Sequence, residues 1–194
     1  MTFYPLLIAA YLIGSISSAI LICRTLGLPD PRTQGSNNPG ATNVRRIAGN
    51  KVAALVLLCD LLKGFLPVFL ANILELSLFE IALIGLGVFL GHIYPVFFDF
   101  KGGKGVATYI GILMGIAPSV GLAFILIWLF IAKVLKISSL SALVATAISP
   151  VYFYLLNDDI ASASVITTLC LLIFYTHRSN IKRLISDEED GIKS

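Results

Sequence analysis

A short polar segment, Phe100–Thr108 (FKGGKGVAT), places two lysines among three glycines between long apolar blocks. Glycine has no Cβ, so its backbone N–H groups can approach a bound ligand closely. A lysine beside them adds a full positive charge. This combination favours an anion, and a phosphate suits it best. The candidate ligands are Lys104, Gly102, Gly103, Gly105 and Thr108.

This segment is not a nucleotide-binding P-loop. That motif needs a glycine, four residues and then Gly-Lys-Ser/Thr, whereas Gly105 follows Lys104 here. A helix that begins near Gly105 would still point its positive end at the same anion. The alternative is a flexible loop whose lysines only set the membrane orientation, and spacing alone does not separate the two.

A second polar segment, Gly35–Arg45 (GSNNPGATNVR), carries no charge before its final arginine. Its hydroxyl and amide side chains can hydrogen-bond to hydroxyls and phosphate oxygens, and an arginine fork pairs bidentately with phosphate. The alternative is a turn-rich linker, because Asn, Gly and Pro favour turns by themselves. The candidate ligands are Ser36, Asn37, Gly40, Thr42, Asn43 and Arg45.

Four further candidate residues lie within apolar blocks: Asp60, Lys63, His92 and His177. Asp60 and Lys63 are three apart, so on a helix they are neighbours, and we expect an ion pair that locks this helix into a bundle. Lys63 also adds to the positive field and is a candidate ligand. His92 and His177 are candidate phosphate ligands or bases, although a packed polar group is the simpler interpretation of a lone histidine.

Other catalytic chemistries find no support in the sequence. The two histidines have no neighbouring cysteine or carboxylate cluster, so we predict no metal site. No Ser–His–Asp or Cys–His pattern can be assigned, which argues against a covalent acyl-enzyme. Cys23, Cys59 and Cys170 lie far apart in apolar blocks, and we expect them to be buried side chains.

The elements that must position these residues are membrane helices. Of the 194 residues, 57% are hydrophobic and 13% are charged, whereas a soluble domain has roughly 25% charged residues. A span needs about 20 apolar residues. We therefore predict an all-α, polytopic membrane helix bundle with seven transmembrane helices. The apolar blocks lie near residues 3–23, 52–74, 78–98, 105–117, 119–132, 138–156 and 160–177.

The charges predict how this bundle is oriented. Seven crossings place every loop lysine and arginine on one face and leave Glu75, Glu80, Asp158 and Asp159 on the other. Cytoplasmic loops collect Lys and Arg, so we predict an outside N-terminus and a cytoplasmic C-terminus. The fourth and fifth blocks are short, but merging them would reverse the side of the loop that follows. A break through Gly115–Pro118 between short or partly re-entrant helices is therefore preferred.

The chain is expected to form one domain over residues 1–186. The acidic run within residues 187–194 is most simply a solvated, flexible tail.

Four segments of the chain resemble the motifs of a known family. Gly35–Arg45, Asp60–Gly64 and Gly91–Thr108 look like the signature motifs of the bacterial acyl-phosphate:glycerol-3-phosphate acyltransferases, and His177–Leu184 is similar to that family's ending. The resemblance runs the length of the chain in the same order. It implies a multi-pass enzyme of the bacterial inner membrane whose active site faces the cytoplasm.

The resemblance also implies a reaction. The enzyme would move a fatty acyl group from acyl phosphate to the 1-hydroxyl of glycerol 3-phosphate, giving lysophosphatidic acid and inorganic phosphate. The family uses neither acyl-CoA nor acyl carrier protein as direct donor, and we expect no cofactor. The expected partners are the two substrates, the lipid bilayer and a soluble enzyme that produces acyl phosphate; no nucleic acid is expected.

Roles for individual residues follow as a hypothesis. Lys104 and the glycine-loop amides would hold the phosphate of the donor and stabilise it as it leaves. Arg45, with Ser36, Asn37 and Asn180, would hold glycerol 3-phosphate. His177 would orient a substrate or assist proton transfer; alternatively, a substrate phosphate takes the hydroxyl proton, which we favour.

The rival interpretation is a membrane transporter for a small organic phosphate, because cationic loops and broken helices also serve transport. A transporter needs access to its site from both faces. The predicted external loops are short and carry no lysine or arginine, which argues against a phosphate pathway and favours the enzyme.

Overall fold

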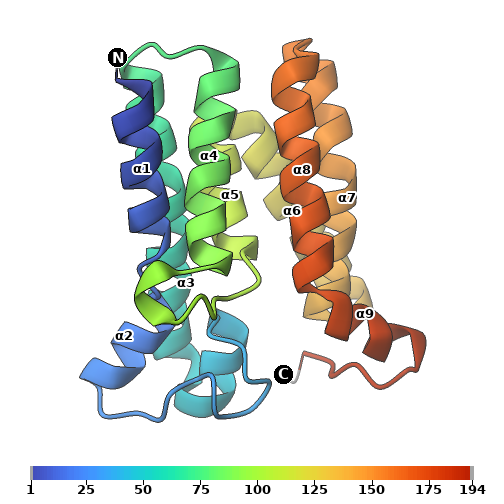
Figure 1. The fold of residues 1–194 in the computed structure, drawn as a ribbon. Coiled ribbons are helices and arrows are strands. Elements are labelled where there is room, and N and C mark those ends of the chain that lie inside the picture. Colours follow the sequence, from blue (N-terminus) through green and yellow to red (C-terminus); the bar gives the residue numbers. More distant parts are fainter. Residues whose placement is uncertain (1, 193–194) are drawn as a thin grey trace.

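The computed structural model describes residues 2–192, and their regular elements are all helical (Figure 1). A short 3₁₀ turn, η1, covers Val96–Phe98. The α-helices are α1 Phe3–Gly14, α2 Ser18–Thr25, α3 Ala41–Ile73, α4 Leu78–Ile93, α5 Val106–Ile116, α6 Pro118–Leu135, α7 Ser138–Asn157, α8 Ile160–Thr176 and α9 Arg178–Ile185.

Local sequence signals explain several helix boundaries. Ser77 and Glu80 form a capping box at the start of α4, which satisfies two backbone N–H groups. Asp159 accepts hydrogen bonds from the first backbone amides of α8. The predicted break through Gly115–Pro118 is confirmed, because α5 ends at Ile116 and Pro118 begins α6, a position where proline loses no helical hydrogen bond.

The apolar blocks agree with the helices except in two places. The first predicted block, residues 3–23, is divided into α1 and α2, which are bent by 46° relative to each other. The predicted second block begins at residue 52, whereas α3 begins at Ala41 and is 33 residues long. Gly49 lies inside it with φ 81°, in the left-handed region that glycine adopts freely. The polar stretch from Ala41 to Gly49 is therefore a helical turn set at an angle to the membrane part of α3.

Four described helical segments are long and apolar enough to cross a membrane: α3, α4 with η1, α6 and α7. The number rises to six if α1 with α2, and α8 with α9, each count as one bent span. Helix α5 is apolar but has only 11 residues, which is about 16 Å at 1.5 Å per residue. The predicted seventh crossing thus depends on this short helix and stays a prediction.

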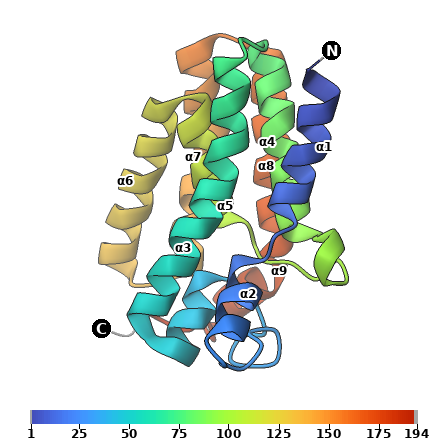
Figure 2. The ribbon, with the colours of Figure 1, turned by 90° about the vertical axis from the view of Figure 1, so that its left-hand side faces the viewer.

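The helices pack side by side in two connected groups. Helix α3 runs along α5 and α1 along α4, while α6, α7 and α8 form the other group, with α4 also packing on α8 (Figures 1 and 2). Glycines allow the closest approach, because a Cβ at Gly64 would overlap the Thr108 carbonyl and one at Gly111 the Leu61 carbonyl. The largest fully buried side chains include Phe89, Tyr109, Phe124 and Phe153.

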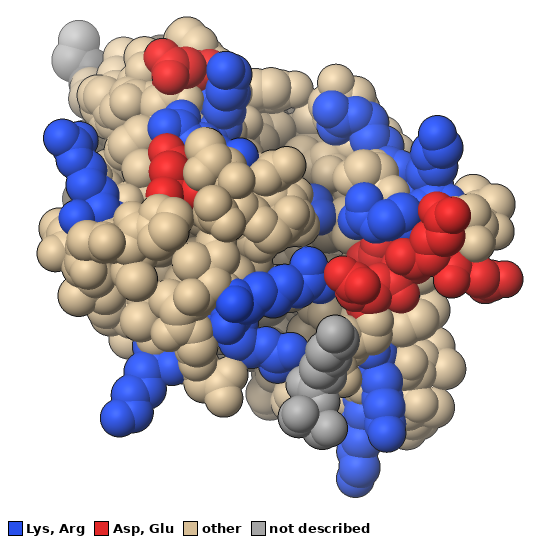
Figure 3. Space-filling model, turned by 90° about the horizontal axis from the view of Figure 1, so that it is seen from below, with Lys and Arg blue, Asp and Glu red and all other residues tan. Residues whose placement is uncertain are grey.

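The two ends of the bundle differ. The N-terminus and the α3–α4 and α7–α8 turns lie at one end, and the loops around residues 26–40 and 94–105 lie with α9 at the other (Figure 1). Seen from this second end, lysines and arginines surround a hollow in the surface (Figure 3). The long polar connections therefore gather at one end, as predicted for the cationic face.

Candidate active site

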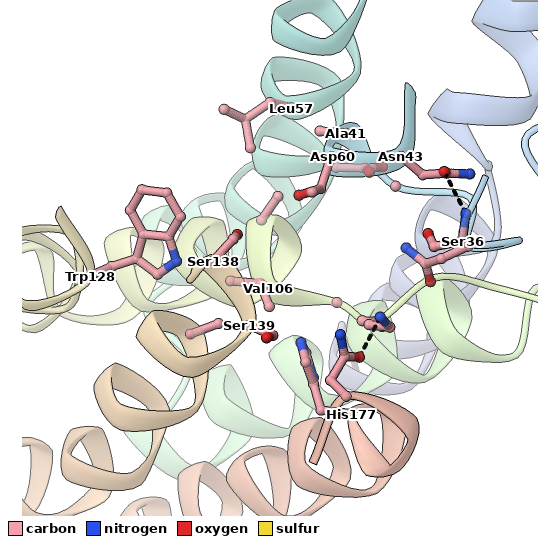
Figure 4. A pocket seen from close by; sticks show the side chains of 18 of the residues that line it. Ser36, Ala41, Asn43, Leu57, Asp60, Val106, Trp128, Ser138, Ser139 and His177 are labelled. Atoms are coloured by element: carbon pink, nitrogen blue, oxygen red, sulfur yellow. Dashed lines mark hydrogen bonds between the residues drawn. The ribbon is translucent and has the colours of Figure 1, made fainter. Parts of the chain in front are cut away.

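A cavity of about 810 Å³ opens among the loops and helix ends at the cationic end of the bundle. Its wall is formed by the segment Gly35–Asn43, by parts of α3, α6, α7 and α9, by the start of α5, and by the chain beyond α9. Segments far apart in the sequence thus meet around one space. Its polar side carries Ser36 and Asn43 with His177 across from them, and its apolar side carries Leu57 and Trp128 (Figure 4).

Three cations line the polar side: Lys104 from the glycine loop, Arg46 from α3 and Arg183 from α9. The Lys104 ammonium donates a hydrogen bond to Asn180 Oδ1 at 2.5 Å. Burial lowers the pKa of Lys104 to about 8, and the neighbouring charges of Arg183 and Arg46 act in the same direction while Glu189 opposes them. An arriving phosphate would relieve this repulsion, so the site suits an anion.

His177, which immediately precedes α9, and Asn180 and Arg183 within α9 line the cavity together, because residues three apart share a side of a helix. His177 is 3% exposed, and its Nδ1 lies 2.9 Å from the Ile173 carbonyl oxygen. A carbonyl oxygen can only accept, so Nδ1 carries the hydrogen and the neutral ring keeps Nε2 as an acceptor. His177 therefore provides a proton acceptor, Nε2, at the cavity.

Glu189 joins these residues from the chain beyond α9. Its Oε1 accepts hydrogen bonds from Ser139 Oγ at 2.7 Å and Asn180 Nδ2 at 2.5 Å, and its Oε2 accepts from Arg183 Nε at 2.6 Å. Burial raises the pKa of Glu189, but these hydrogen bonds outweigh it and hold the pKa below its usual value. Asp190 also pairs with Arg46 at 3.2 Å. The described part of the predicted solvated tail is thus tied to the cavity wall.

The segment Gly35–Asn43 is held in place by the side chain of Asn43, which is 1% exposed. Asn43 Oδ1 accepts a hydrogen bond from the Ser36 backbone N–H at 2.9 Å, and Nδ2 donates to the carbonyls of Pro31 and Gln34, each at 2.9 Å. These bonds use most of the capacity of the amide. Asn43 therefore shapes the loop, while Ser36 keeps its hydroxyl for a ligand.

The glycine loop rests on the end of α4. The Gly103 N–H donates to the His92 carbonyl at 3.3 Å, and a Cβ at Gly103 would lie 2.6 Å from His92 Nε2. His92 Nδ1 lies 3.2 Å from Thr108 Oγ1. Because the loop packs closely on His92, a side chain would not fit at Gly103. The same packing brings Lys104 to the cavity.

The predicted Asp60–Lys63 ion pair is confirmed, with 2.9 Å between Lys63 Nζ and Asp60 Oδ1. Lys63 Nζ also donates to the Ile16 carbonyl at 2.8 Å. Asp60 lines the cavity, whereas Lys63 does not. Lys63 therefore positions its partner and links α3 to the α1–α2 break.

The cavity has an apolar wing between the two groups of helices. Its apolar lining comes from α3 and α5 of the first group and from α6 of the second. Its lining includes Leu57, Leu61, Ile110, Ile125, Trp128 and Leu129. A mostly apolar wall with a few convergent polar groups is typical of a small-molecule site. Among residues 2–192 no group of three or more His, Cys, Asp or Glu is arranged to hold a metal ion.

Known proteins match this chain along nearly its whole length. The family model for "Glycerol-3-phosphate acyltransferase" matches residues 4–187. The chain belongs to this family. The curated glycerol-3-phosphate acyltransferase of Ruthia magnifica subsp. Calyptogena magnifica is 57% identical over 190 residues, which is 98% of this chain and 96% of the relative. That of Methylococcus capsulatus is 49% identical over 180 residues, 93% of this chain and 91% of the relative.

Two solved structures of the glycerol-3-phosphate acyltransferase family share the fold. Both are crystal structures of PlsY (YgiH), an integral membrane glycerol 3-phosphate acyltransferase. The glycerol 3-phosphate form has a TM-score of 0.95 at 38% identity, covering 100% of this chain and 96% of that one. The lysophosphatidic acid form has a TM-score of 0.92 at 37% identity, covering 98% and 95%.

Most of the residues singled out in the acyltransferase sequence meet at the cavity. Those that line it are Lys104, His177, Asn180, Ser36, Gly40, Thr42, Asn43, Gly105 and His92. Those that do not are Arg45, Asn37, Lys63, Gly102, Gly103 and Thr108. Four residues of the second set support the site from outside the cavity. Gly102, Gly103 and Thr108 pack on His92, and Lys63 is paired with Asp60.

Of the adjacent arginines on α3, Arg46 lines the cavity and the predicted Arg45 does not. Helical spacing does not separate them, because Arg45 and Arg46 are three and four residues after Thr42, which also lines the cavity. Sequence reasoning also missed Arg183 and Glu189. Arg183 could have been found from its three-residue spacing to Asn180 and His177, whereas nothing in the sequence joins Glu189 to Ser139.

Proposed function

We propose that this protein transfers a fatty acyl group from acyl phosphate to the 1-hydroxyl of glycerol 3-phosphate, giving lysophosphatidic acid and inorganic phosphate. The observation that carries the proposal is one cavity with a cationic end and an apolar wing. Both substrates carry phosphate and one carries a long chain, so the two ends match their chemistry. The relatives named glycerol-3-phosphate acyltransferase support the same reaction, as do the PlsY structures in the glycerol 3-phosphate and lysophosphatidic acid forms.

Each part of the cavity receives a role in this proposal. Lys104, the backbone at Gly105 and the N-terminus of α5, which line the cavity, hold the donor phosphate; Gly102 and Gly103 lie outside it and only position the loop. Arg46 and Asn180, with Ser36 from the opposite loop, hold glycerol 3-phosphate; Arg46 replaces Arg45 because it lines the cavity. The acyl chain lies in the apolar wing beside Trp128, where burial of its methylene groups supplies binding energy.

The chemistry needs no protein nucleophile. The 1-hydroxyl oxygen attacks the acyl carbonyl carbon, a new C–O bond forms, and the bond between this carbon and the phosphate oxygen breaks. The leaving phosphate takes the hydroxyl proton, while Lys104 neutralises its charge. His177 orients the hydroxyl through Nε2, the acceptor that its bond to Ile173 leaves available.

The membrane arrangement is also a proposal. We place the protein in the bacterial inner membrane with seven crossings, counting α1–α2 and α8–α9 as one crossing each and α5 as a short one. The N-terminus is then outside, and the cavity faces the cytoplasm. The start of α1 and the end of α9 lie at opposite ends of the bundle, which supports an odd number of crossings (Figure 1).

The test uses purified protein in lipid vesicles, supplied with acyl phosphate and glycerol 3-phosphate. We expect stoichiometric release of phosphate and lysophosphatidic acid. Lys104→Ala should lower the rate by about a hundredfold or more, as for removal of one anion-stabilising donor. The matched control is Lys101→Ala, an exposed lysine of the same segment that does not line the cavity, and it should keep its activity. Transport of glycerol 3-phosphate without phosphate release would favour the rival transporter.

A further inference from the structure

The carboxyl group of Asp60 is unusual in this cavity, because the proposed reaction gives it no task. It lies on α3, is 3% exposed and lines the cavity (Figure 4). Its neighbours in the wall include the three cations that suit phosphate. The ion pair with Lys63 offsets part of the cost of burying this acid, but Lys63 does not line the cavity and so does not explain why the acid does.

The two oxygens of this carboxyl group have different surroundings. Oδ1 accepts a hydrogen bond from Ser18 Oγ at 2.9 Å, lies 2.9 Å from Lys63 Nζ, and is 3.9 Å from His92 Nδ1. Within residues 2–192, no hydrogen bond to Oδ2 accompanies these contacts. A carboxylate can accept about four hydrogen bonds, so Oδ2 keeps capacity for a ligand in the cavity.

The neighbours of Oδ1 fix the direction of the group. Ser18 comes from α2, and Lys63 is itself anchored to the Ile16 carbonyl at 2.8 Å. These contacts fasten the carboxyl group to the break between α1 and α2. The direction of Oδ2 is thus fixed by α2, through Ser18, and by Lys63, which is anchored to the α1–α2 break; a specific acceptor needs such support.

The ligand of Oδ2 must be a hydrogen-bond donor without negative charge. We propose that Asp60 accepts a hydrogen bond from a hydroxyl group of the phosphorylated polyol acceptor and so distinguishes its hydroxyl end from its phosphate end. This inference rests on the proposed function. The cations Lys104, Arg46 and Arg183 attract the phosphate, and Asp60 repels it, so the acceptor has one favourable orientation in the cavity.

This arrangement has a consequence for specificity. A site built to hydrogen-bond a substrate hydroxyl discriminates strongly against an analogue that lacks it, because a buried polar group then stays unpaired. Phosphorylated alcohols with one hydroxyl fewer should therefore bind weakly. The effect should disappear when the acid itself is replaced.

The experiment measures binding of glycerol 3-phosphate and two deoxy analogues to the full-length protein in vesicles by calorimetry, without donor. One analogue, 3-hydroxypropyl phosphate, lacks the 2-hydroxyl, and the other, 2-hydroxypropyl phosphate, lacks the 1-hydroxyl. Loss of a hydrogen bond to a charged group should weaken binding about tenfold or more. We expect the wild type to discriminate against at least one analogue, which identifies the hydroxyl, and Asp60→Asn to lose this discrimination.

Kinetics and controls separate recognition from a structural role. Asp60→Asn should raise KM for glycerol 3-phosphate and leave KM for acyl phosphate unchanged. Asp99→Asn removes the same charge from an exposed side chain outside this cavity and should change neither. Ser18→Ala removes only a contact of Oδ1, so it should retain discrimination between the analogues.

Several outcomes would overturn the inference. If the wild type binds both analogues as tightly as glycerol 3-phosphate, Asp60 recognises no hydroxyl, whatever the variants do. The same follows if Asp60→Asn folds and still discriminates. A wild type that binds glycerol 3-phosphate selectively but transfers no acyl group would instead contradict the proposed function and leave the inference about Asp60 standing.

Discussion

The charge of Lys104 depends on its surroundings, and the reaction depends on that charge. Burial lowers its pKa to about 8, so in the free enzyme the ammonium is present below this pH and is lost as the pH rises through it. Because the donor phosphate needs the charged form, kcat/KM for acyl phosphate should fall about tenfold per pH unit above about 8. This parameter reports the free enzyme, so the measurement is a pH profile of initial rates at low donor concentration.

The matched variant for this pH profile is Lys104→Arg, because a guanidinium keeps its charge across the accessible range. Any residual activity of this variant should persist to higher pH than that of the wild type. An unchanged midpoint in the variant would assign the decline to another group. The two profiles therefore test the charge of Lys104 rather than its shape.

At the scale of elements, the glycine loop sets how α5 begins. Gly105 precedes α5 with φ 87°, and a Cβ there would lie 2.6 Å from Phe89 Cζ. Gly105→Ala should thus destabilise the protein twice, through about 1–2 kcal/mol of backbone strain and through displacement of a buried ring. Gly27→Ala is the control. Gly27 has φ 66° with open space around it, so this substitution introduces backbone strain but displaces no neighbouring side chain.

Thermal unfolding in detergent and acyl transfer are the measurements for this pair. Gly105→Ala should lower the melting temperature more than Gly27→Ala, and it alone should lower activity, because it moves Lys104. Equal losses in both variants would mean that the Phe89 contact does not hold the loop.

The elements also show what a sequence can predict. Apolar blocks and Pro118 located most helices, because a membrane span and a helix N-terminus have strong local signals. The cavity lining was predicted less well at Arg46, because Arg45 and Arg46 both lie at helical spacing from Thr42 and only the packed structure shows which one lines the cavity. The contact between Glu189 and Ser139 could not be predicted, because it joins residues 50 apart in sequence and depends on how the chain beyond α9 returns to the start of α7.

At the scale of the whole molecule, the distribution of polar connections predicts how the bundle sits in the membrane. The cavity lies at the end with the long cationic loops, and α5 and α6 meet at a turn short of the ends of α3 and α4 (Figure 2). An 11-residue helix spans about half of a hydrocarbon core of about 30 Å. The proposed membrane arrangement is therefore best tested by finding on which side of the membrane each end of the bundle lies.

Two exposed positions at opposite ends test the proposed orientation. Asp158 lies in the α7–α8 turn and Lys101 in the glycine loop, and both are exposed. In a variant without Cys23, Cys59 and Cys170, single cysteines made by Asp158→Cys and Lys101→Cys should differ toward a membrane-impermeant maleimide. Intact cells should label only Asp158→Cys, and Lys101→Cys should react after permeabilisation. The reverse pattern would place the cavity outside, where an acyl phosphate made in the cytoplasm could not reach it, and would contradict the proposed arrangement.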